Sequence, residues 1–291
     1  MPLVRPEDIR HHYDHLSVFY RALWGDHIHH GYWENTESPT VAQLKLIERL
    51  AARARIPHGA RVLDIGCGLG GSALWLAGKL RCSVLGVTIS PVQAAMAAEQ
   101  ARSEKLEDRV RFEVMDANHL DLPPQSFDAV WIIESSEHLH DKRRFIESCA
   151  RVLRPGGALA LCAWLFADRF KRPDHERLVA EVCRGMLCPS LASMPDYIAW
   201  MRAAGFEAIE AEDITSNIQK TWTLCSALIR KPAVTRLLSR LGDPSTRRFI
   251  RAFAAIRRAY AKGAMSYGMF TARCPQPLYS TTSRRVARAA L

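Results

Sequence analysis

The chain of 291 residues is 48% hydrophobic and carries a net charge of +10, which suits a globular protein of one large domain or two small ones. No stretch reaches the roughly 18 apolar residues of a membrane span, and residues 1–10 carry charge and proline where a signal peptide would be apolar. We therefore expect neither export nor a spanning helix, but a cytoplasmic protein that is at most peripheral to a membrane.

The first 57 residues predict a helical cap. Aromatic and apolar residues at helical spacing predict a helix over residues 6–24, and a polar, histidine-rich loop follows as far as Trp33. Ser38 and Pro39 suit the cap and the first turn of a second helix, over residues 40–55.

Residues 58–164 alternate between apolar runs and helical stretches. We predict strands at 61–65, 83–87, 110–114, 127–133 and 158–163, and helices at 71–80, 91–104 and 137–153. Strands that alternate with helices form a parallel sheet with helices on both faces. The predicted fold class is therefore α/β, with a Rossmann-like, doubly wound sheet as the core.

The alternation loosens after residue 164. We predict helices at 174–187 and 195–204, strands at 206–213 and 265–273, and a helical lid between these strands, at about 214–263. The last two strands would complete a mostly parallel sheet of seven strands. Residues 165–291 would thus form the C-terminal part of the sheet with the lid inserted in it.

The lid carries almost all of the net charge. Between residues 214 and 263 eleven basic residues stand against one acid, Asp243, among apolar residues that include Leu237 and Leu238. Such a segment is either a solvated face or one attracted to an anionic membrane surface or a phosphorylated isoprenoid. Nucleic acid is not expected as a partner, because the interleaved aromatic residues that stack on bases are missing.

A glycine-rich turn follows the first predicted strand. Gly66, Gly68 and Gly71 satisfy the pattern G-x-G-x-x-G, which is typical of dinucleotide sites, although tight packing without a ligand gives the same pattern. Glycines let the backbone N–H groups of such a turn approach a ligand at an electropositive helix N-terminus.

Two features favour S-adenosylmethionine over NAD at this turn. Asp64, two residues before the first glycine, could neutralise an ammonium group but would repel a pyrophosphate. Residues 86–88, at the end of the second strand, are Gly-Val-Thr and lack the acid that binds a ribose diol. The aminoacyl end of S-adenosylmethionine needs a carboxylate for its ammonium group and N–H donors for its carboxyl group.

The sequence around these positions resembles one family. Residues 62–68 resemble the first motif of class I S-adenosylmethionine-dependent methyltransferases, and residues 153–157 resemble their motif before the fifth strand. Further segments resemble the gamma-tocopherol C-methyltransferase-like branch, at residues 13–33, 86–93, 134–142 and 264–273. Enzymes of that branch methylate aromatic or isoprenoid carbon, alkaloid nitrogen and, in bacterial relatives, sugar or polyketide oxygen, so the resemblance leaves the acceptor open.

The resemblance implies which residues bind the cofactor. They fall into aminoacyl, ribose and adenine subsites, which are Asp64, Gly66, Cys67 and Gly68, then Thr88, Ile89 and Gln93, then Asp116 and Ala117. Aromatic faces attract cations, so aromatic side chains would close over the sulfonium, although ordinary helix packing is an alternative for them. These side chains are Tyr13, His30, Tyr32 and Trp33.

Candidates for catalysis lie at the same edge of the sheet, where ligands of open sheets collect. Methyl transfer depends on alignment and on the exclusion of water, and a histidine would also help to deprotonate a hydroxyl or phenol. We expect His138 and Glu134 to act in catalysis, because they stand at positions i and i+4 across the start of a helix. His30 and His29 come next, and a histidine that only caps or packs is the alternative.

No metal is expected. The eight cysteines form no CxxC pair and no metal spacing, so we expect reduced core thiols. The histidines at 27, 29 and 30 are not joined by a cysteine or an acid at helical i, i+4 spacing.

The sequence therefore predicts methyl transfer from S-adenosylmethionine to a lipophilic small molecule, at carbon, nitrogen or oxygen. Residues 162–164 are Cys-Ala-Trp, where the sugar methyltransferases that the chain resembles carry an aspartate base, which favours an apolar or aromatic acceptor. A methyltransferase of sugar or polyketide hydroxyls is one alternative, and a non-catalytic cofactor-binding module that docks on membranes through the lid is another.

Overall fold

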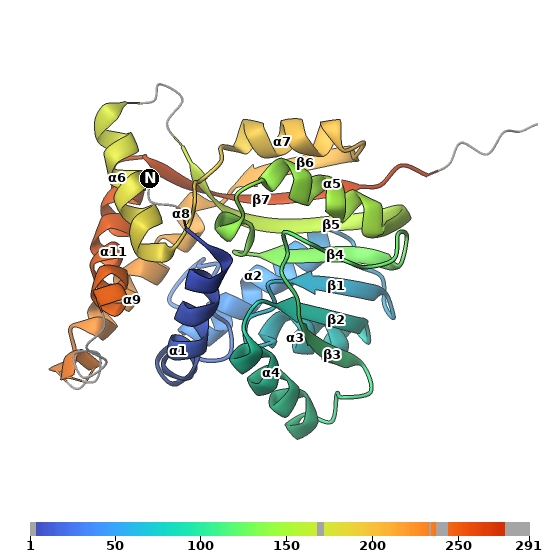
Figure 1. Ribbon diagram of the computed structural model, residues 1–291, viewed down its shortest axis with the longest axis horizontal. Helices are drawn as coiled ribbons and strands as arrows, with labels where there is room; N and C mark the ends of the chain where they lie inside the picture. Colours follow the sequence, from blue (N-terminus) through green and yellow to red (C-terminus); the bar gives the residue numbers. More distant parts are fainter. Residues whose placement is uncertain (1–3, 168–171, 233, 237–243, 277–291) are drawn as a thin grey trace, which may run out of the picture.

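The computed structural model describes residues 4–167, 172–232, 234–236 and 244–276, in which a seven-stranded sheet is covered by helices on both faces (Figure 1). Its strands lie in the order β3-β2-β1-β4-β5-β7-β6, and all neighbours are parallel except that β7 is antiparallel to β5 and β6. The strands are β1 Arg61–Ile65, β2 Ser83–Thr88, β3 Val110–Val114, β4 Phe127–Ile133, β5 Leu153–Phe166, β6 Glu207–Asp213 and β7 Met265–Arg273. The predicted Rossmann-like, doubly wound fold is confirmed.

The central strands are apolar at successive positions because both of their faces are buried. Successive side chains of a strand point to opposite faces, and Val62 and Leu63 of β1 accordingly join two different hydrophobic clusters. Residues of α2 (Pro39–Arg53) and α3 (Gly71–Leu80) belong to the first cluster, and residues of α5 (Lys142–Val152) and α7 (Met194–Ala203) to the second. The helix α2, assigned to the cap from the sequence, therefore packs on the sheet.

The order of the strands places a crevice at one edge of the sheet. β1 has β2 on one side and β4 on the other, so the chain winds in opposite directions from β1. Ligands of open α/β sheets bind at such a switch point, beyond the carboxyl ends of the strands. The segments that follow β1, β2, β3 and β4 all reach this edge.

The segment after β4 differs from the prediction. Instead of one helix over 137–153, a short 3-10 turn, η1 Ser136–His138, is followed by extended Leu139, and α5 begins only at Lys142. The side chain of Asp141 accepts a hydrogen bond from the backbone N–H of Arg144, which fixes this later helix start. The expected i, i+4 relation of Glu134 and His138 across a helix start is therefore wrong.

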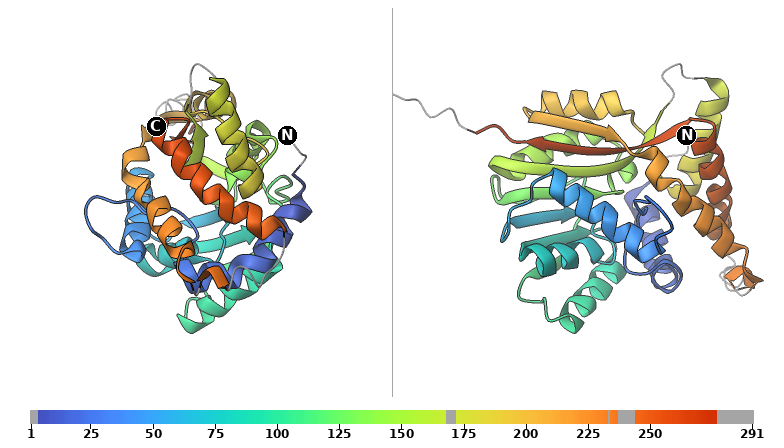
Figure 2. Two further views of the ribbon diagram at one scale, coloured as in Figure 1. Left: turned by 90° about the vertical axis from the view of Figure 1, so that its left-hand side faces the viewer. Right: turned by 180° about the vertical axis from the view of Figure 1, so that it is seen from behind.

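Helices from both ends of the chain cover the carboxyl edge of the sheet (Figures 1 and 2). They are α1 Pro6–Trp24, α6 Pro173–Met186, α8 Thr215–Ile218, α9 Lys220–Ile229 and α11 Pro244–Ala261. α4, Pro91–Ser103, lies beside α1. In the described part of the chain, no helix combines the length and the apolar character needed to cross a membrane.

The lid helix α11 has two different faces. Phe249, Phe253 and Ile256 are buried, whereas Arg247 and Arg251 are exposed. Leu237, Leu238 and Asp243, which the sequence assigned to the lid, lie outside the described residues. All eight cysteines of the chain carry free thiols.

Candidate active site

The glycine turn borders a small cavity, which we call the turn cavity. It has a volume of about 330 Å³, part of it open to solvent, and its lining includes Asp64, Gly66, Cys67 and Gly68 together with His29. A Cβ atom on Gly66 would lie 2.2 Å from the Cβ of Ser135, so only glycine fits there, and at Gly68 a Cβ would meet nothing within 4 Å. The backbone of the turn is therefore open to a ligand.

Asp64 is the acid of the turn cavity that lacks a partner among the described residues, and the ring atoms His27 Nδ1 and His29 Nε2 lack one too. Asp64 is 2% exposed, and its Oδ2 atom has no hydrogen-bond partner among the described residues. Burial raises the pKa of its carboxyl group to about 7. A buried carboxylate without a partner is costly, and an ammonium group in the turn cavity would remove that cost.

A second cavity of about 740 Å³, the strand-end cavity, continues from the turn cavity past Ile28, Gly66 and Gly68. It brings together the sequence-predicted residues that follow β2, β3 and β4, which are Thr88, Ile89, Gln93, Asp116, Ala117 and Glu134. Thr88 donates from Oγ1 to Gln93 Oε1 over 2.8 Å. These residues thus form one continuous wall.

Two of the predicted aromatic residues lie elsewhere. Tyr32 and Trp33 line none of the cavities that border the carboxyl edge. The ring of Tyr32 packs under the guanidinium of Arg49 at 4.9 Å, and Trp33 Nε1 donates to Thr221 Oγ1 over 3.0 Å. Their rings pack against α2 and α9, so the structure gives no support to the expectation that they close over a sulfonium, which stays a prediction.

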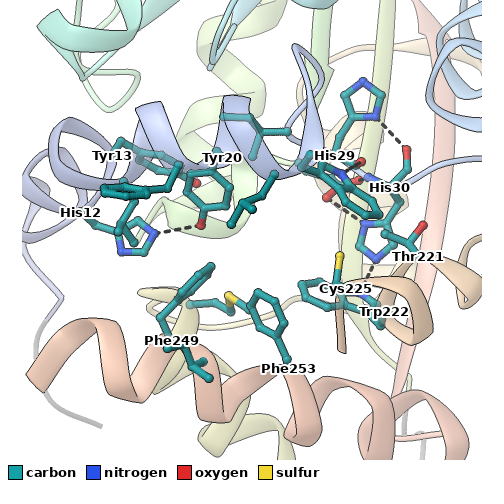
Figure 3. A pocket seen from close by; sticks show the side chains of 18 of the residues that line it. His12, Tyr13, Tyr20, His29, His30, Thr221, Trp222, Cys225, Phe249 and Phe253 are labelled. Carbon is teal, nitrogen blue, oxygen red and sulfur yellow. Dashed lines mark hydrogen bonds and ion pairs between the residues drawn. The ribbon is translucent and has the colours of Figure 1, made fainter. Parts of the chain in front are cut away.

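A third cavity, which we call the aromatic cavity, lies under the helical cap and has a volume of about 1090 Å³. Figure 3 shows His12 and Tyr20 of α1 facing Phe249 and Phe253 of α11, with Trp222 at the other end. None of its described lining residues is an arginine or a lysine. The residues that line both this cavity and the strand-end cavity are Tyr13, Ile28, Glu134 and His138.

Glu134 sits at this boundary with both carboxylate oxygens occupied. Its side chain is 6% exposed. It accepts hydrogen bonds from the N and Nδ1 atoms of His30, from Trp164 Nε1 and from Tyr267 Oη, all between 2.7 and 2.9 Å. Burial alone would raise the pKa of this carboxyl group, but His30 outweighs burial and lowers it to about 2.

His30 is equally engaged. Its Nδ1 atom contacts Glu134, and its Nε2 atom accepts a hydrogen bond from Trp222 Nε1. Both ring nitrogens of His30 are therefore occupied by the protein, and the residue joins the loop after α1 to β4 and α9.

His138 and Tyr13 form a second buried pair at the boundary. Tyr13 Oη lies 2.8 Å from His138 Nε2, and His138 Nδ1 lies 3.0 Å from the backbone oxygen of Leu187. Because a carbonyl can only accept, Nδ1 carries the proton and Nε2 accepts from the tyrosine. Burial lowers the pKa of His138, so the ring is neutral at neutral pH.

Sequence reasoning missed two residues next to His138. Glu137 is 2% exposed and lines the aromatic cavity, and Lys142 is 3% exposed. Lys142 Nζ donates to the backbone oxygen of Leu139 over 2.6 Å, which holds the turn that carries His138. No signal in the sequence indicated their burial, because residues 134–142 are mostly polar.

Comparison with known proteins agrees with this architecture. Residues 63–161 match a protein family described as a methyltransferase domain. The 27-O-demethylrifamycin SV methyltransferase of Amycolatopsis mediterranei (strain S699) is 36% identical over 277 residues, which cover 93% of this chain and 98% of that protein. The probable chloroplastic tocopherol O-methyltransferase of Oryza sativa subsp. japonica is 32% identical over 281 residues, which cover 91% of this chain and 77% of that protein.

The chain belongs to the class I S-adenosylmethionine-dependent methyltransferases. Among solved structures, the cyclase SpnF superposes with a TM-score of 0.79 at 28% identity, over 93% of this chain and 96% of that one. The cofactor of this methyltransferase is S-adenosylmethionine.

The residues of the turn cavity fit that cofactor. S-adenosylmethionine has an ammonium group, and Asp64 Oδ2 is a buried acceptor without a partner among the described residues. When bound, the cofactor supplies a methyl group activated on a sulfonium. No group of three or more His, Cys, Asp or Glu side chains in the described ranges is arranged to hold a metal ion.

Proposed function

We propose that this methyltransferase acts on an uncharged, lipophilic small molecule that carries a hydroxyl group and binds in the aromatic cavity. The observation that supports this is the cavity itself. It has a volume of about 1090 Å³, part of it open to solvent, and is lined mainly by aromatic and aliphatic side chains, without arginine or lysine among its described lining residues. Small-molecule sites of this kind bind mainly by apolar burial, with a few polar groups that fix orientation.

A phosphorylated isoprenoid is a poorer candidate. Phosphates are usually bound by arginine or lysine side chains, and those of α11 that are described, such as Arg247 and Arg251, are exposed. The name of the Oryza relative specifies methylation of oxygen, which supports a hydroxyl group as the acceptor.

In the proposed reaction the protein holds the two reactants in position and excludes water. Asp64 holds the ammonium end of the cofactor, while Thr88 with Gln93 and Asp116 contact its ribose and adenine. Tyr13 and His138, at the boundary of the two cavities, orient the acceptor against the methyl group. Holding two reactants in line and excluding water accounts for much of the rate in such transfers.

Glu134 and His30 have a positioning role in this proposal. A carboxylate with four hydrogen bonds and a pKa of about 2 is a weak base. Its contacts with His30 and Tyr267 tie the loop after α1 to the sheet, and so keep the boundary between the cavities intact.

Membrane contact is proposed only for the outer face of α11. Its exposed arginines, which include Arg247, Arg248 and Arg251, could attract an anionic surface from which a lipophilic acceptor enters. A cytoplasmic location, with this face against a membrane, is part of the same proposal.

The proposal is tested by transfer of a labelled methyl group to a panel of alkylphenols, isoprenoid alcohols, isoprenoid phosphates, amines and sugars. We expect label in alkylphenols or isoprenoid alcohols and not in the phosphates. Preferential labelling of a phosphate or a sugar would contradict the proposal. A relative with this fold is a cyclase, so binding of the cofactor without any transfer would contradict it as well.

A further inference from the structure

Glu137 is a buried acid at the wall of the aromatic cavity. It stands in the turn Ser136–His138, directly before His138. Its Oε1 atom accepts a hydrogen bond from the backbone N–H of Trp164 over 2.6 Å, which fixes the carboxyl group against β5. Its Oε2 atom has no hydrogen-bond partner among the described residues.

The acid Glu134 and the base His138, which line both the aromatic cavity and the strand-end cavity, are already occupied. Glu134 uses both oxygens for hydrogen bonds within the protein. His138 uses Nε2 for Tyr13 and Nδ1 for the carbonyl of Leu187. Glu137, on the wall of the aromatic cavity, therefore differs from Glu134 and His138, because one of its carboxyl oxygens can interact with a ligand without breaking a bond within the protein. His29 Nε2 also lacks a partner among the described residues, but burial lowers the pKa of His29 and makes it a weaker base.

The surroundings of Glu137 make it a stronger base than an ordinary carboxylate. Burial raises the pKa of its carboxyl group to about 8, and the negative charge of Glu134 acts in the same direction. The N–H of Trp164 and the ammonium of Lys142 oppose this rise. Lys142 itself donates to backbone oxygens and not to the carboxyl group.

The remaining titratable groups that interact with Glu137 come from several elements. Tyr13 of α1, Tyr197 of α7, Tyr260 of α11, Tyr267 of β7 and the thiols of Cys162 and Cys188 all interact electrostatically with it. Each of these groups is neutral at neutral pH, because burial raises its pKa above the ordinary value.

We propose that Glu137 is the catalytic base of the methyltransferase and takes the proton of the acceptor hydroxyl on its Oε2 atom. This inference rests on the proposed function. In the step, the O–H bond of the acceptor and the bond between sulfur and methyl carbon break, and a bond between oxygen and methyl carbon forms. The proton goes to Glu137. The positive charge of the sulfonium and the negative charge of the carboxylate disappear together, which is favourable at a site of low dielectric.

The test compares Glu137→Gln with the wild-type chain on two acceptors of similar shape. One is a 4-alkylphenol, and the other is the matching 4-alkyl-2,6-dinitrophenol, which is ionised throughout the neutral pH range and needs no base. In the variant, the amide oxygen of the substituted side chain can still accept from Trp164, but the amide cannot take a proton. We expect kcat with the alkylphenol to fall by roughly 100-fold or more, with little loss for the dinitrophenol.

Two further measurements separate a base from a packing residue. The rate of the wild-type chain with the alkylphenol should rise with pH as Glu137 ionises, and this rise should be absent in Glu137→Gln. Calorimetry should give the same cofactor affinity for both chains. Glu147→Gln, a change at an exposed acid that pairs with Arg143 on α5, serves as the matched control and should leave all three readouts unchanged.

Equal loss of rate on both phenols would overturn the role of Glu137 as a base and leave the proposed function standing. If the wild-type chain binds the cofactor but methylates no hydroxyl of any acceptor in the panel, both proposals are overturned.

Discussion

The turn cavity and the aromatic cavity meet a ligand in different ways. The turn cavity presents a buried carboxylate without a partner and a glycine backbone open to the ligand, and it is formed largely by residues directly after β1. The aromatic cavity is formed mainly by helices from opposite ends of the chain, and the boundary residues Glu134 and His138 are hydrogen-bonded within the protein. In the proposed function, the cofactor is thus recognised by polar atoms of the turn cavity, and the acceptor mainly by shape and apolar contact.

This contrast indicates which of the two cavities determines the choice of acceptor. The carboxylate of Asp64 and the glycine backbone of the turn cavity suit one zwitterionic end group. Apart from Glu134 and Glu137, the aromatic cavity is lined mainly by aromatic and aliphatic side chains, so different acceptors can be accommodated by changing the side chains of α1, α9 and α11. Relatives of similar fold can therefore share a cofactor and differ in acceptor.

The largest effect is expected at the boundary between the cavities. Glu134→Ala would leave His30, Trp164 and Tyr267 without their common acceptor, and loss of one partner from a buried charged network costs about 3–5 kcal/mol. Urea denaturation should show this loss in the free energy of unfolding. Glu134→Gln keeps two acceptor positions on its oxygen and should lose less. Equal stability of Glu134→Ala and wild type would mean that the network does not hold the cap.

An intermediate effect is expected in the turn cavity. Asp64→Asn should weaken cofactor binding by roughly 1–3 kcal/mol, the scale of a lost hydrogen bond to a charged group, because the amide cannot neutralise an ammonium group. Calorimetry with S-adenosylmethionine measures this directly. Binding of an alkylphenol, followed through the fluorescence of Trp164 and Trp222 that line the aromatic cavity, should not change. If the variant lost affinity for the cofactor and for the alkylphenol alike, the two cavities would not bind their ligands independently.

The pH dependence of cofactor binding follows from the same residue. Asp64 in the free protein has a pKa of about 7, and it must be ionised to pair with an ammonium group. Below pH 7 binding therefore has to release a proton, so affinity falls as the pH falls, and above pH 7 this dependence ends. Asp64→Asn should bind with an affinity that is constant across this range. If the cofactor affinity of the variant still changed with pH, a group other than Asp64 would be responsible for that change.

The smallest effect is expected on the outer face of α11. Replacing Arg247, Arg248 or Arg251 singly by Gln should weaken binding to anionic vesicles by at most about 1 kcal/mol for each charge. The KM for an uncharged alkylphenol should stay unchanged, because these exposed side chains do not line the aromatic cavity. Vesicle sedimentation at low and high salt measures the first effect. If it shows no binding for the wild-type chain either, the basic face is only solvated.

The turn cavity was largely predictable because its residues are close in sequence to strands. The apolar run of β1, the glycines after it and Asp64 form one continuous segment, and parallel strands bring their carboxyl ends to one edge of the sheet. Thr88 and Asp116, which follow β2 and β3, reach the strand-end cavity for the same reason. In these cases local pattern and chain order together decide the position.

The aromatic cavity was less predictable because its walls come from distant segments. Tyr32 and Trp33 belong to a motif that suggested a sulfonium cage, yet their partners Arg49 and Thr221 hold them against α2 and α9. Glu134 and Glu137 lie three residues apart, and the sequence favoured Glu134 together with His138 and indicated no role for Glu137. The difference between the two glutamates depends on His30, Trp164 and Tyr267, which approach from other elements.

By itself, the sequence determined the doubly wound sheet, the cofactor and the residues at the ends of β1 to β3, because strand periodicity and glycine turns act over short stretches of chain. The tertiary structure alone decided which buried acid is saturated with hydrogen bonds and which is free. That property depends on side chains that lie more than 100 positions away in the sequence and meet only when the cap closes over the sheet.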